Sequence, residues 1–416
     1  MLALAIAAAA LVLYALSQSR LRNTVLSGPL LFLLLGVLMS PEVFGGFTLE
    51  LDDETITVLL KVTLVLLLFT EASELRARRL RSEASIPSRL LLVAMPLVMA
   101  IGLGFGLVLL GVLSFWEAAT LAAILAPTDA ALSLPVVQNE RVPGVIRRSL
   151  VVEAGLNDGL AVPFAFGFAA VVAFKADDLS RPDFLEFLFD QLVFGVVFGL
   201  LVGWLGAKLA NATLTDDDAS NRWGEIAFVA LAGVAFASAE AVDGNGFIAA
   251  WVAGLAFAFF KLPEIHVQRF ADRAGNLLTL ASFLVFGALL VPQAFKSMDG
   301  ATLVYAVAAL LIVRPVAVAV SMIGTHFRIP TVAFLGWFGP RGIASLILAA
   351  LVAKKFDVPN IDTILAVVAV TVALSVLLHG LSAAPGSSSY GDWLRRSGLG
   401  PLAGYEKAAA TDESGE

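Results

Sequence analysis

The feature that most constrains the fold of this chain is a succession of long apolar segments separated by short polar tracts. Of its 416 residues, 59% are hydrophobic and only 15% are charged, whereas a soluble globular chain carries roughly 25% charged residues. A helix that crosses a bilayer needs about 20 mostly apolar residues, so we predict an all-α polytopic membrane protein with about thirteen transmembrane helices. The predicted spans are residues 1–17, 25–40, 55–74, 88–111, 115–137, 144–174, 185–210, 223–241, 245–261, 268–292, 301–325, 329–353 and 360–383.

The composition also excludes several kinds of site. The chain has no cysteine, which excludes disulfides, thiolate metal sites and cysteine nucleophiles. Its three histidines (His266, His326 and His379) are far apart in the sequence, so we expect neither a zinc site nor a bound cofactor. No basic patch typical of nucleic-acid binding is present.

The distribution of Lys and Arg predicts the orientation in the membrane, because cytoplasmic connections are enriched in these residues. With the N-terminus outside and the C-terminus cytoplasmic, 19 of the 27 Lys and Arg residues fall on the cytoplasmic side. The first apolar segment lacks the basic start of a signal peptide, so we expect it to remain as a span. We therefore predict a multi-pass protein of the inner or plasma membrane.

A proline and an aspartate interrupt the fifth predicted span, LAAILAPTDAALSLPVV. A charge at the bilayer centre costs at least ~2.5–3.5 kcal/mol on insertion scales, so Asp129 requires a reason. Pro127 has no backbone donor and disfavours helix at the preceding residue, which predicts an unwound segment. Freed carbonyls beside the carboxylate could bind a cation. The alternative is a proline kink in which Asp129 only caps the second half-helix, and both interpretations can hold together.

The sixth predicted span contains two acids in VVEAGLNDGLAVP. Glu153 and Asn157 share one helix face, while Asp158 lies about 140° further round than Glu153. Acids on different faces favour different roles, one neutralised by an arginine and the other free to hold a cation or a proton. The alternative is that Asn157 and Asp158 only hydrogen-bond between helices. Gly155 and Gly159 would allow a neighbouring helix to approach closely.

Arg314, in ALLIVRPVAV, and Arg341, in FLGWFGPRGIASL, lie deep enough within spans to require partners. The GPRG sequence breaks the twelfth span much as Pro127 breaks the fifth. Discontinuous helices at corresponding places in two halves of a transporter indicate a binding site at the membrane midplane. We therefore predict two inverted repeats, the first six and the last six spans, whose broken helices cross.

In combination, these motifs resemble the monovalent cation/proton antiporter superfamily, and within it the electroneutral NhaP-like and NHE-like sodium/proton antiporters. The matching stretches are LFTEASEL, APTDAALSLPVV, SLVVEAGLNDGLAVPF, GNGFIAAWVAGLAF, LLTLASFLVFGALL and GWFGPRGIASLILA. The resemblance implies an NhaA/NhaP-like fold, a homodimer, and exchange of Na⁺, Li⁺ or K⁺ for H⁺ by an elevator-like movement. The implied parts are interface helices at 1–86 and 215–299, core helices at 87–176 and 300–384, and a linker helix at 177–214. From its Gly/Ser-rich and acidic composition, we expect segment 385–416 to be a disordered cytoplasmic tail.

The resemblance also implies which residues bind the transported ions. Asp129 and Asp158 would hold the cation (Na⁺ in the first instance) and the proton in turn. Thr128 would contribute its backbone carbonyl, and Glu71, in FTEA, would reach the site through water. Ala154 stands where these proteins usually have a hydroxyl residue, so one expected oxygen ligand is missing and the choice of cation stays open.

The remaining residues would support the site. Glu153 would pair with Arg314 or Arg341, and Asn157 would orient that pair. The Asn157-Asp158 sequence resembles the electroneutral branch, because electrogenic relatives have Asp-Asp there and a lysine in the tenth span, which this chain lacks. The resemblance therefore implies exchange of one cation for one proton.

The residues alone leave other classes of protein open. A sodium-coupled solute symporter of similar fold would need a larger polar cavity. A channel would need a continuous pore, and nothing in the sequence resembles a selectivity filter. An intramembrane enzyme is disfavoured, because no Ser/Lys or His pairing converges and an Asp129–Asp158 dyad lacks a recognisable motif. We predict a transporter rather than an enzyme, and an antiporter before a symporter.

Overall fold

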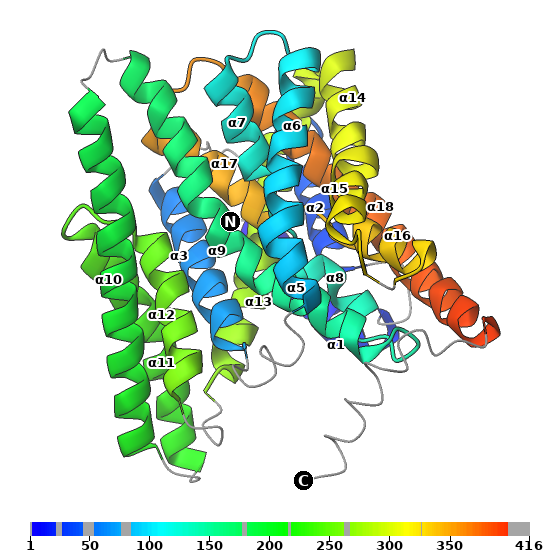
Figure 1. Ribbon diagram of the computed structural model, residues 1–416. Helices are drawn as coiled ribbons and strands as arrows, with labels where there is room; N and C mark the ends of the chain where they lie inside the picture. Colours follow the sequence, from blue (N-terminus) through cyan, green and yellow to red (C-terminus); the bar gives the residue numbers. More distant parts are fainter. Residues whose placement is uncertain are drawn as a thin grey trace.

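The structure, a computed structural model, describes residues 2–21, 27–44, 54–75, 85–176, 181–214, 218–261, 267–325 and 327–397. Within these residues every regular element is a helix, and the helices pack into one bundle (Figure 1). A backbone surrounded by lipid has no water to satisfy its N–H and C=O groups, and a helix satisfies them internally. The predicted all-α fold class is confirmed.

Eight helices in the described residues are long and apolar enough to cross a membrane. They are α3 (Glu54–Ser73), α5–η1–α6 (Ser85–Arg89, Leu90–Ala94 and Met95–Leu109), α9 (Gly144–Ala176), α10 (Arg181–Thr213), α11 (Asp218–Glu240), α13 (Arg269–Ser297), α14–η2–α15 (Gly300–Ala308, Ala309–Val313 and Arg314–Ser321) and α18 (Ile361–Arg396). The shorter helices are α1 (Leu2–Leu21), α2 (Gly28–Met39), α7 (Phe115–Ile124), α8 (Ala130–Val137), α12 (Gly246–Phe260), α16 (Ile329–Trp337) and α17 (Ile343–Lys355). Every predicted span coincides with a helix or with consecutive helices, while the number of complete crossings stays a prediction.

The two halves of the chain repeat the same irregularities. The fourth predicted span contains the π-helical turn η1, and the eleventh contains the π-helical turn η2. A proline, Pro96 or Pro315, is the second residue of the helix that follows each turn. Because proline cannot donate a backbone hydrogen bond, it favours a local departure from the α-helical pattern. The fifth and twelfth predicted spans are both broken in the middle. This correspondence supports the two predicted repeats.

The broken helices lie between two groups of intact ones. Figure 1 shows α10, α11 and α12 together at the left and α6, α14 and α15 at the right, with α7 and α17 between them. On the left, α3 packs against α12. On the other side, α7 packs against α6 and α9. The predicted division into interface helices, core helices and a linker helix stays a prediction.

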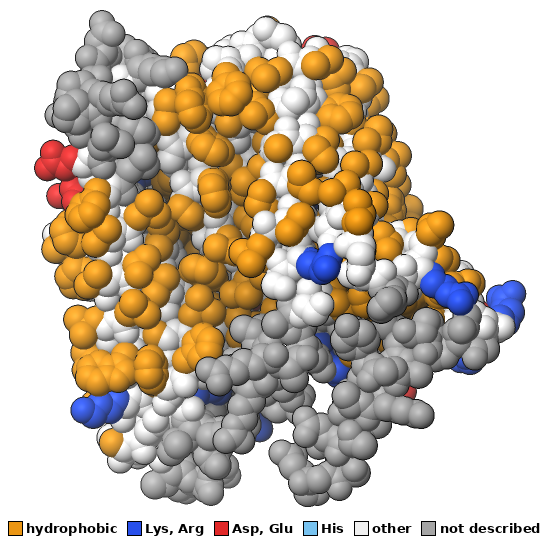
Figure 2. Space-filling view, viewed as in Figure 1, with side chains coloured by type: hydrophobic (Ala, Val, Ile, Leu, Met, Phe, Trp, Pro, Cys, Tyr) orange, Lys and Arg blue, Asp and Glu red, His pale blue; other side chains and the backbone are white. Residues whose placement is uncertain are grey.

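The surface of the bundle is apolar. In Figure 2, hydrophobic side chains cover the middle of the visible face, and Lys and Arg side chains gather toward its lower end. Leu16, Leu92 and Val108 are among many large apolar side chains that are more than two-thirds exposed. Monomeric soluble proteins rarely expose large continuous apolar patches. A multi-pass membrane protein has such a surface because lipid covers it.

Helix α18 continues beyond its predicted end. The prediction of a disordered tail from residue 385 is wrong for residues 385–396, which are helical. Packing holds this part of the helix: Tyr390 is 5% exposed and stacks on Phe334, with ring centroids 4.3 Å apart. Its hydroxyl lies 2.9 Å from that of Thr331. The Gly/Ser-rich composition could not reveal contacts with a distant helix. The rest of the predicted tail, residues 398–416, lies outside the described residues.

We expect Tyr390→Ala to lower the free energy of unfolding by about 3 kcal/mol, because it removes a buried aromatic ring. Thermal denaturation in detergent measures the effect. Ser389→Ala, at an exposed position of the same turn, is the control and should melt like the wild type. If both variants melt at the wild-type temperature, this end of α18 is not held by Tyr390.

Candidate functional site

The first break separates α7 from α8 at residues 125–129. A capping box of Ser114 and Glu117 starts α7. The helix ends before Pro127, which has no N–H to continue the hydrogen-bond ladder. Asp129 then caps α8, since its Oδ1 accepts a 2.9 Å hydrogen bond from the Leu132 N–H. The predicted unwound segment is confirmed, and so is the capping role of Asp129.

The second break, at residues 338–342 between α16 and α17, meets the first. The Asp129 N–H donates to the Pro340 carbonyl at 2.9 Å. Asp129 Oδ2 accepts a further 2.9 Å hydrogen bond from the Ile343 N–H, at the start of α17. Gly342 allows this approach, because a Cβ at that position would overlap the Asp129 carboxylate. The predicted crossing of the two broken helices is therefore confirmed.

Opposite charges balance the half-helix ends at this crossing. The N-termini of α8 and α17 carry partial positive charge, which the Asp129 carboxylate compensates. Beyond the C-terminus of α7, the carbonyls of Ala126 and Pro127 accept hydrogen bonds of 2.6 and 2.8 Å from Arg341 Nη1. Arg341 is only 1% exposed, so these carbonyls are needed to stabilise its buried charge. Its role is to hold the first break.

The partner of Glu153 is Arg314. Arg314 Nη1 donates to Glu153 Oε1 at 2.7 Å and Nη2 donates to Oε2 at 3.0 Å, which gives a buried, two-fold hydrogen-bonded ion pair. Gly339 leaves room for it, because a Cβ there would overlap the guanidinium. The pair joins α9 to the start of α15 beside the second break. This geometry decides between the two arginines that the sequence left open.

Asn157 has a different role from the one that the resemblance implies. Its amide nitrogen donates to Thr128 Oγ1 at 2.6 Å and therefore connects α9 to the first break. In the hydrogen bonds of the described residues it does not orient the Glu153–Arg314 pair. The spacing correctly puts Glu153 and Asn157 on one side of α9, but the neighbouring segments decide what each one contacts.

Two further acids approach the crossing. Asp158 is 5% exposed, and its Oδ1 is buried without a hydrogen-bond partner among the described residues, as is Oε2 of Glu71. Both lie close enough to Asp129 to interact with it electrostatically. Neighbouring ionised carboxylates repel one another, and a proton or cation bound between them relieves the repulsion. The structure thus brings together Glu71, Asp129 and Asp158, with Thr128 next to Asp129 in the chain.

Small residues let two helices reach α9 beside Asp158, as predicted. A Cβ on Gly155 would lie 3.2 Å from the Glu71 carbonyl oxygen of α3. A Cβ on Gly159 would overlap the Trp251 indole of α12. The Trp251 Nε1 is buried without a partner among the described residues. Trp251 could not be identified from the sequence, because a tryptophan in an apolar span does not indicate which helix it contacts.

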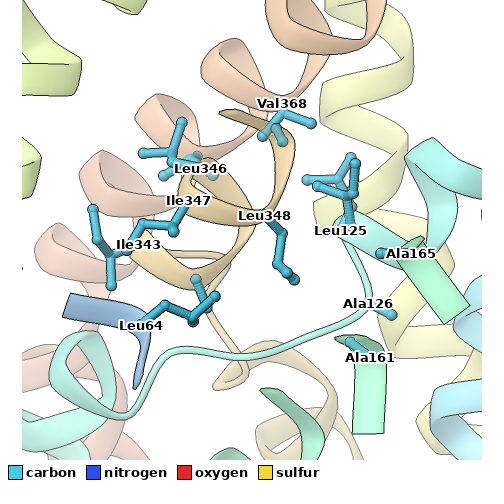
Figure 3. Close-up of a cluster of buried hydrophobic side chains, with 14 of the residues drawn as sticks. Leu64, Leu125, Ala126, Ala161, Ala165, Ile343, Leu346, Ile347, Leu348 and Val368 are labelled. Carbon is cyan, nitrogen blue, oxygen red and sulfur yellow. The ribbon is translucent and has the colours of Figure 1, made fainter. Parts of the chain in front are cut away.

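Apolar side chains surround α17 next to the crossing. Figure 3 shows a cluster whose members come from α3, the first break, α9, α17 and α18. Its labelled residues are Leu64, Leu125, Ala126, Ala161, Ala165, Ile343, Leu346, Ile347, Leu348 and Val368. Surroundings of low polarity strengthen ion pairs and make unpaired charges costly. Any charge change at the site therefore has to be compensated locally.

Residues of α18 also contact the second break, and sequence analysis missed them. Ser375 Oγ accepts a 2.7 Å hydrogen bond from the Arg341 N–H. His379 Nε2 lies 2.8 Å from the Trp337 carbonyl oxygen. A histidine within a predicted span was the available signal, because polar side chains are energetically costly there.

Ala154, where a hydroxyl residue was expected, is buried and offers no side-chain oxygen.

Comparison with known proteins identifies relatives of this chain. Residues 6–386 match the sequence model of the transmembrane sodium/hydrogen exchanger family. The K⁺/H⁺ antiporter NhaP of Alkalimonas amylolytica is 28% identical over 368 residues, covering 86% of this chain and 61% of that protein. A Schizosaccharomyces pombe protein named "Probable Na(+)/H(+) antiporter" is 26% identical over 363 residues, covering 78% and 47%. The chain thus spans from 47% to 61% of the length of these relatives.

The fold has a solved counterpart. The sodium proton antiporter MjNhaP1 from Methanocaldococcus jannaschii, solved at pH 8, superimposes with a TM-score of 0.75. The match covers 94% of this chain and 99% of that one, at 20% identity. At this identity the likeness shows the fold, and the predicted NhaP-like antiporter fold is confirmed.

Breaking the Glu153–Arg314 pair is expected to destabilise the protein. Glu153→Gln or Arg314→Gln strands one buried charge, which costs about 3–5 kcal/mol of the free energy of unfolding. In thermal denaturation, the double variant should lose less stability than the two single losses together. Arg341→Gln is the comparison variant: Arg341 acts on Glu153 only through space, so its coupling with Glu153→Gln should be clearly smaller than that of Arg314→Gln. Additivity of Glu153→Gln with both arginine variants would contradict the pair.

Proposed function

Because the chain belongs to the transmembrane sodium/hydrogen exchanger family, we propose that it is a secondary active antiporter that exchanges Na⁺, K⁺ or Li⁺ for H⁺. The observation that carries the proposal is the buried carboxyl oxygen of Asp158, which has no hydrogen-bond partner among the described residues and lies near Asp129. A carboxylate so placed can hold a proton or a hard cation, which prefers oxygen ligands. Competition between the two would couple their movements in opposite directions.

The acids at the crossing have different surroundings, which suggests different roles. Asp129 already accepts backbone hydrogen bonds on both oxygens, so it would hold α8 and α17 in place while offering remaining lone pairs to a cation. Asp158 would be the group that alternates between proton and cation. The Thr128 carbonyl would supply a neutral oxygen, and Glu71 would contribute through water. Without a hydroxyl at Ala154, water would complete the coordination shell.

The buried arginines would keep the rest of the site constant during transport. Guanidinium groups stay protonated at accessible pH. Arg314 is neutralised by Glu153, and Arg341 is stabilised by helix-end carbonyls. The charge of the site then depends only on what the carboxyl groups hold. One proton exchanged for one monovalent cation would leave that charge unchanged.

The proposal includes the larger movement and assembly that the resemblance implies. The core helices, 87–176 and 300–384, would carry the site past the interface helices, 1–86 and 215–299, joined by the linker helix at 177–214. The contact between these two parts would include Gly155 and Gly159 of α9, which the Glu71 carbonyl of α3 and the Trp251 ring of α12 approach closely. The interface helices would form a homodimer in the cell membrane, with the N-terminus outside and the C-terminus cytoplasmic.

The transported cation is proposed only as a class. Among the relatives, the Alkalimonas amylolytica protein is named a K⁺/H⁺ antiporter and the Schizosaccharomyces pombe protein a Na⁺/H⁺ antiporter. The absence of a hydroxyl ligand at Ala154 does not favour either ion. Adding each cation separately to proteoliposomes would decide between them.

We expect Asp158→Asn to abolish exchange in an assembled protein, because an amide cannot alternate between a proton and a cation. Dequenching of a pH-sensitive dye in proteoliposomes, after addition of Na⁺, K⁺ or Li⁺, measures the flux. Asp129→Asn should weaken transport and also lower thermal stability, since an amide does not compensate the helix dipoles. Asp362→Asn, at an exposed position, is the control. Wild-type flux in Asp158→Asn would reject the site.

Exchange is also expected to be independent of membrane voltage, because both loaded forms of the site carry the same charge. A potassium–valinomycin potential of either sign can be imposed on proteoliposomes while Na⁺ or Li⁺ uptake is followed. The uptake rate should not change with polarity. Clear acceleration by one polarity, or a current on a solid-supported membrane that persists during steady exchange, would show that exchange moves net charge.

A further inference from the structure

We propose that His379 is a positioning residue of the exchange site: its imidazole holds the break between α16 and α17 and couples its own protonation to Arg341. The proposal rests on the proposed function, because that break supplies a backbone donor, the Ile343 N–H, to Asp129. His379 is on α18, 2% exposed, and its ring stacks on the Trp337 indole with centroids 4.7 Å apart. Its polar neighbours in the described structure are the Trp337 carbonyl and Ser375.

The hydrogen bonds of the ring fix the position of one proton. Nε2 lies 2.8 Å from the Trp337 carbonyl oxygen. A carbonyl oxygen can only accept, and it is the sole partner of Nε2 among the described residues. Nδ1 also faces the Ser375 hydroxyl, which can donate to it, so the single proton of a neutral ring is best placed on Nε2. The Gly339 N–H donates to the same carbonyl at 2.9 Å. The last residue of α16 is therefore held by two donors, one from α18 and one from the break itself.

The other ring nitrogen faces two alternative partners. Nδ1 lies 2.9 Å from the Ser375 carbonyl oxygen and 3.2 Å from Ser375 Oγ. The same Oγ accepts the hydrogen bond of the Arg341 N–H. If Nδ1 is unprotonated, the Ser375 hydroxyl can donate to it, and a continuous chain runs from Arg341 through Ser375 and His379 to Trp337. If Nδ1 gains a proton, it must donate to the carbonyl, and the hydroxyl loses its acceptor.

The charges around the ring make its protonation matter to the site. Arg341 and Arg314 both act on His379 electrostatically. Glu153 compensates Arg314, whereas Arg341 relies on the carbonyls of the first break. An imidazolium would add positive charge beside Arg341 and repel its guanidinium. Because Ile343, the donor to Asp129, is two residues further along, a shift of the break lowers the affinity of the site for a cation.

The test uses three substitutions along this chain and one control at the same junction. His379→Gln retains an N–H donor for Trp337 but cannot be protonated. His379→Phe retains the stacking and loses both hydrogen bonds, and Ser375→Ala removes the acceptor for the Arg341 N–H. Ser382→Ala is the control, because it removes the hydroxyl that accepts from the Trp337 indole without involving a titratable group.

Cation-driven proton flux is measured in proteoliposomes against cation concentration and pH. His379→Phe and Ser375→Ala should raise the half-saturating cation concentration about three- to tenfold, the effect of losing one hydrogen bond. His379→Gln should stay within about twofold of the wild type near neutral pH, and its cation affinity should fall less steeply on acidification, because only the competition between proton and cation at the carboxyl groups then remains. Ser382→Ala should retain the wild-type affinity and pH profile. A purely structural role, which overturns the proposal, would lower the folded amount of the variants and leave affinity and pH profile unchanged.

Hydrogen–deuterium exchange of a peptide spanning residues 338–343 gives a readout that does not need transport. Acidification should increase exchange of the Arg341 amide, relative to its intrinsic rate, in the wild type but not in His379→Gln. Absence of flux in the wild type with every cation would reject the proposed function. Wild-type flux together with identical acid inhibition and amide exchange in His379→Gln would reject the role of His379 alone.

Discussion

A helix interrupted inside an apolar bundle leaves backbone N–H and C=O groups without partners, and the rest of this structure depends on how those groups are satisfied. Asp129 and Arg341 do so reciprocally. Asp129 belongs to the first break and accepts from Ile343 at the second, whereas Arg341 belongs to the second break and donates to the carbonyls of the first. If α7 and α8 moved without α16 and α17, or the reverse, Asp129, Arg341 and the backbone groups that they bind would lose their hydrogen-bond partners.

Under the proposed function, this reciprocal arrangement would separate fixed charges from exchangeable ones. The Glu153–Arg314 pair and Arg341 are held by short hydrogen bonds, so they form a constant background. Asp158, on a different face of α9 from Glu153, has an oxygen that accepts no hydrogen bond from the described residues. In the proposed exchange such a contrast is needed, because the oxygen without a protein donor can bind and release a ligand while the other groups keep their partners.

Much of this could be predicted because the bilayer makes polar residues informative. The cost of placing polar groups in lipid predicts the positions of the helices, the break at Pro127 and the burial of Asp129, Glu153 and Asp158. The sequence could not predict which arginine pairs with Glu153. Both Arg314 and Arg341 lie in the middle of a predicted span, and each is next to a proline in the sequence. The pairing depends on which guanidinium faces α9 after the helices have packed.

Other features lay outside the reach of local patterns. The bond from Asn157 to Thr128 depends on the position of the first break, and the helical end of α18 depends on Tyr390 meeting Phe334. Similarly, His379 in an apolar segment indicates only that a partner exists, and the partner is a carbonyl on another helix. Periodicity shows which face a residue occupies, and tertiary packing decides what that face meets.

The sequence separation of the two breaks has a consequence for biogenesis. The Ala126 carbonyl and the Arg341 guanidinium that binds it are 215 residues apart. At about 5–20 residues per second, a ribosome needs roughly 10–40 s to synthesise the intervening chain. During that interval the first broken helix has left the ribosome without its partner, and its exposed carbonyls need water or the insertion machinery to solvate them. The nascent first half is therefore a substrate for quality control until the second half arrives.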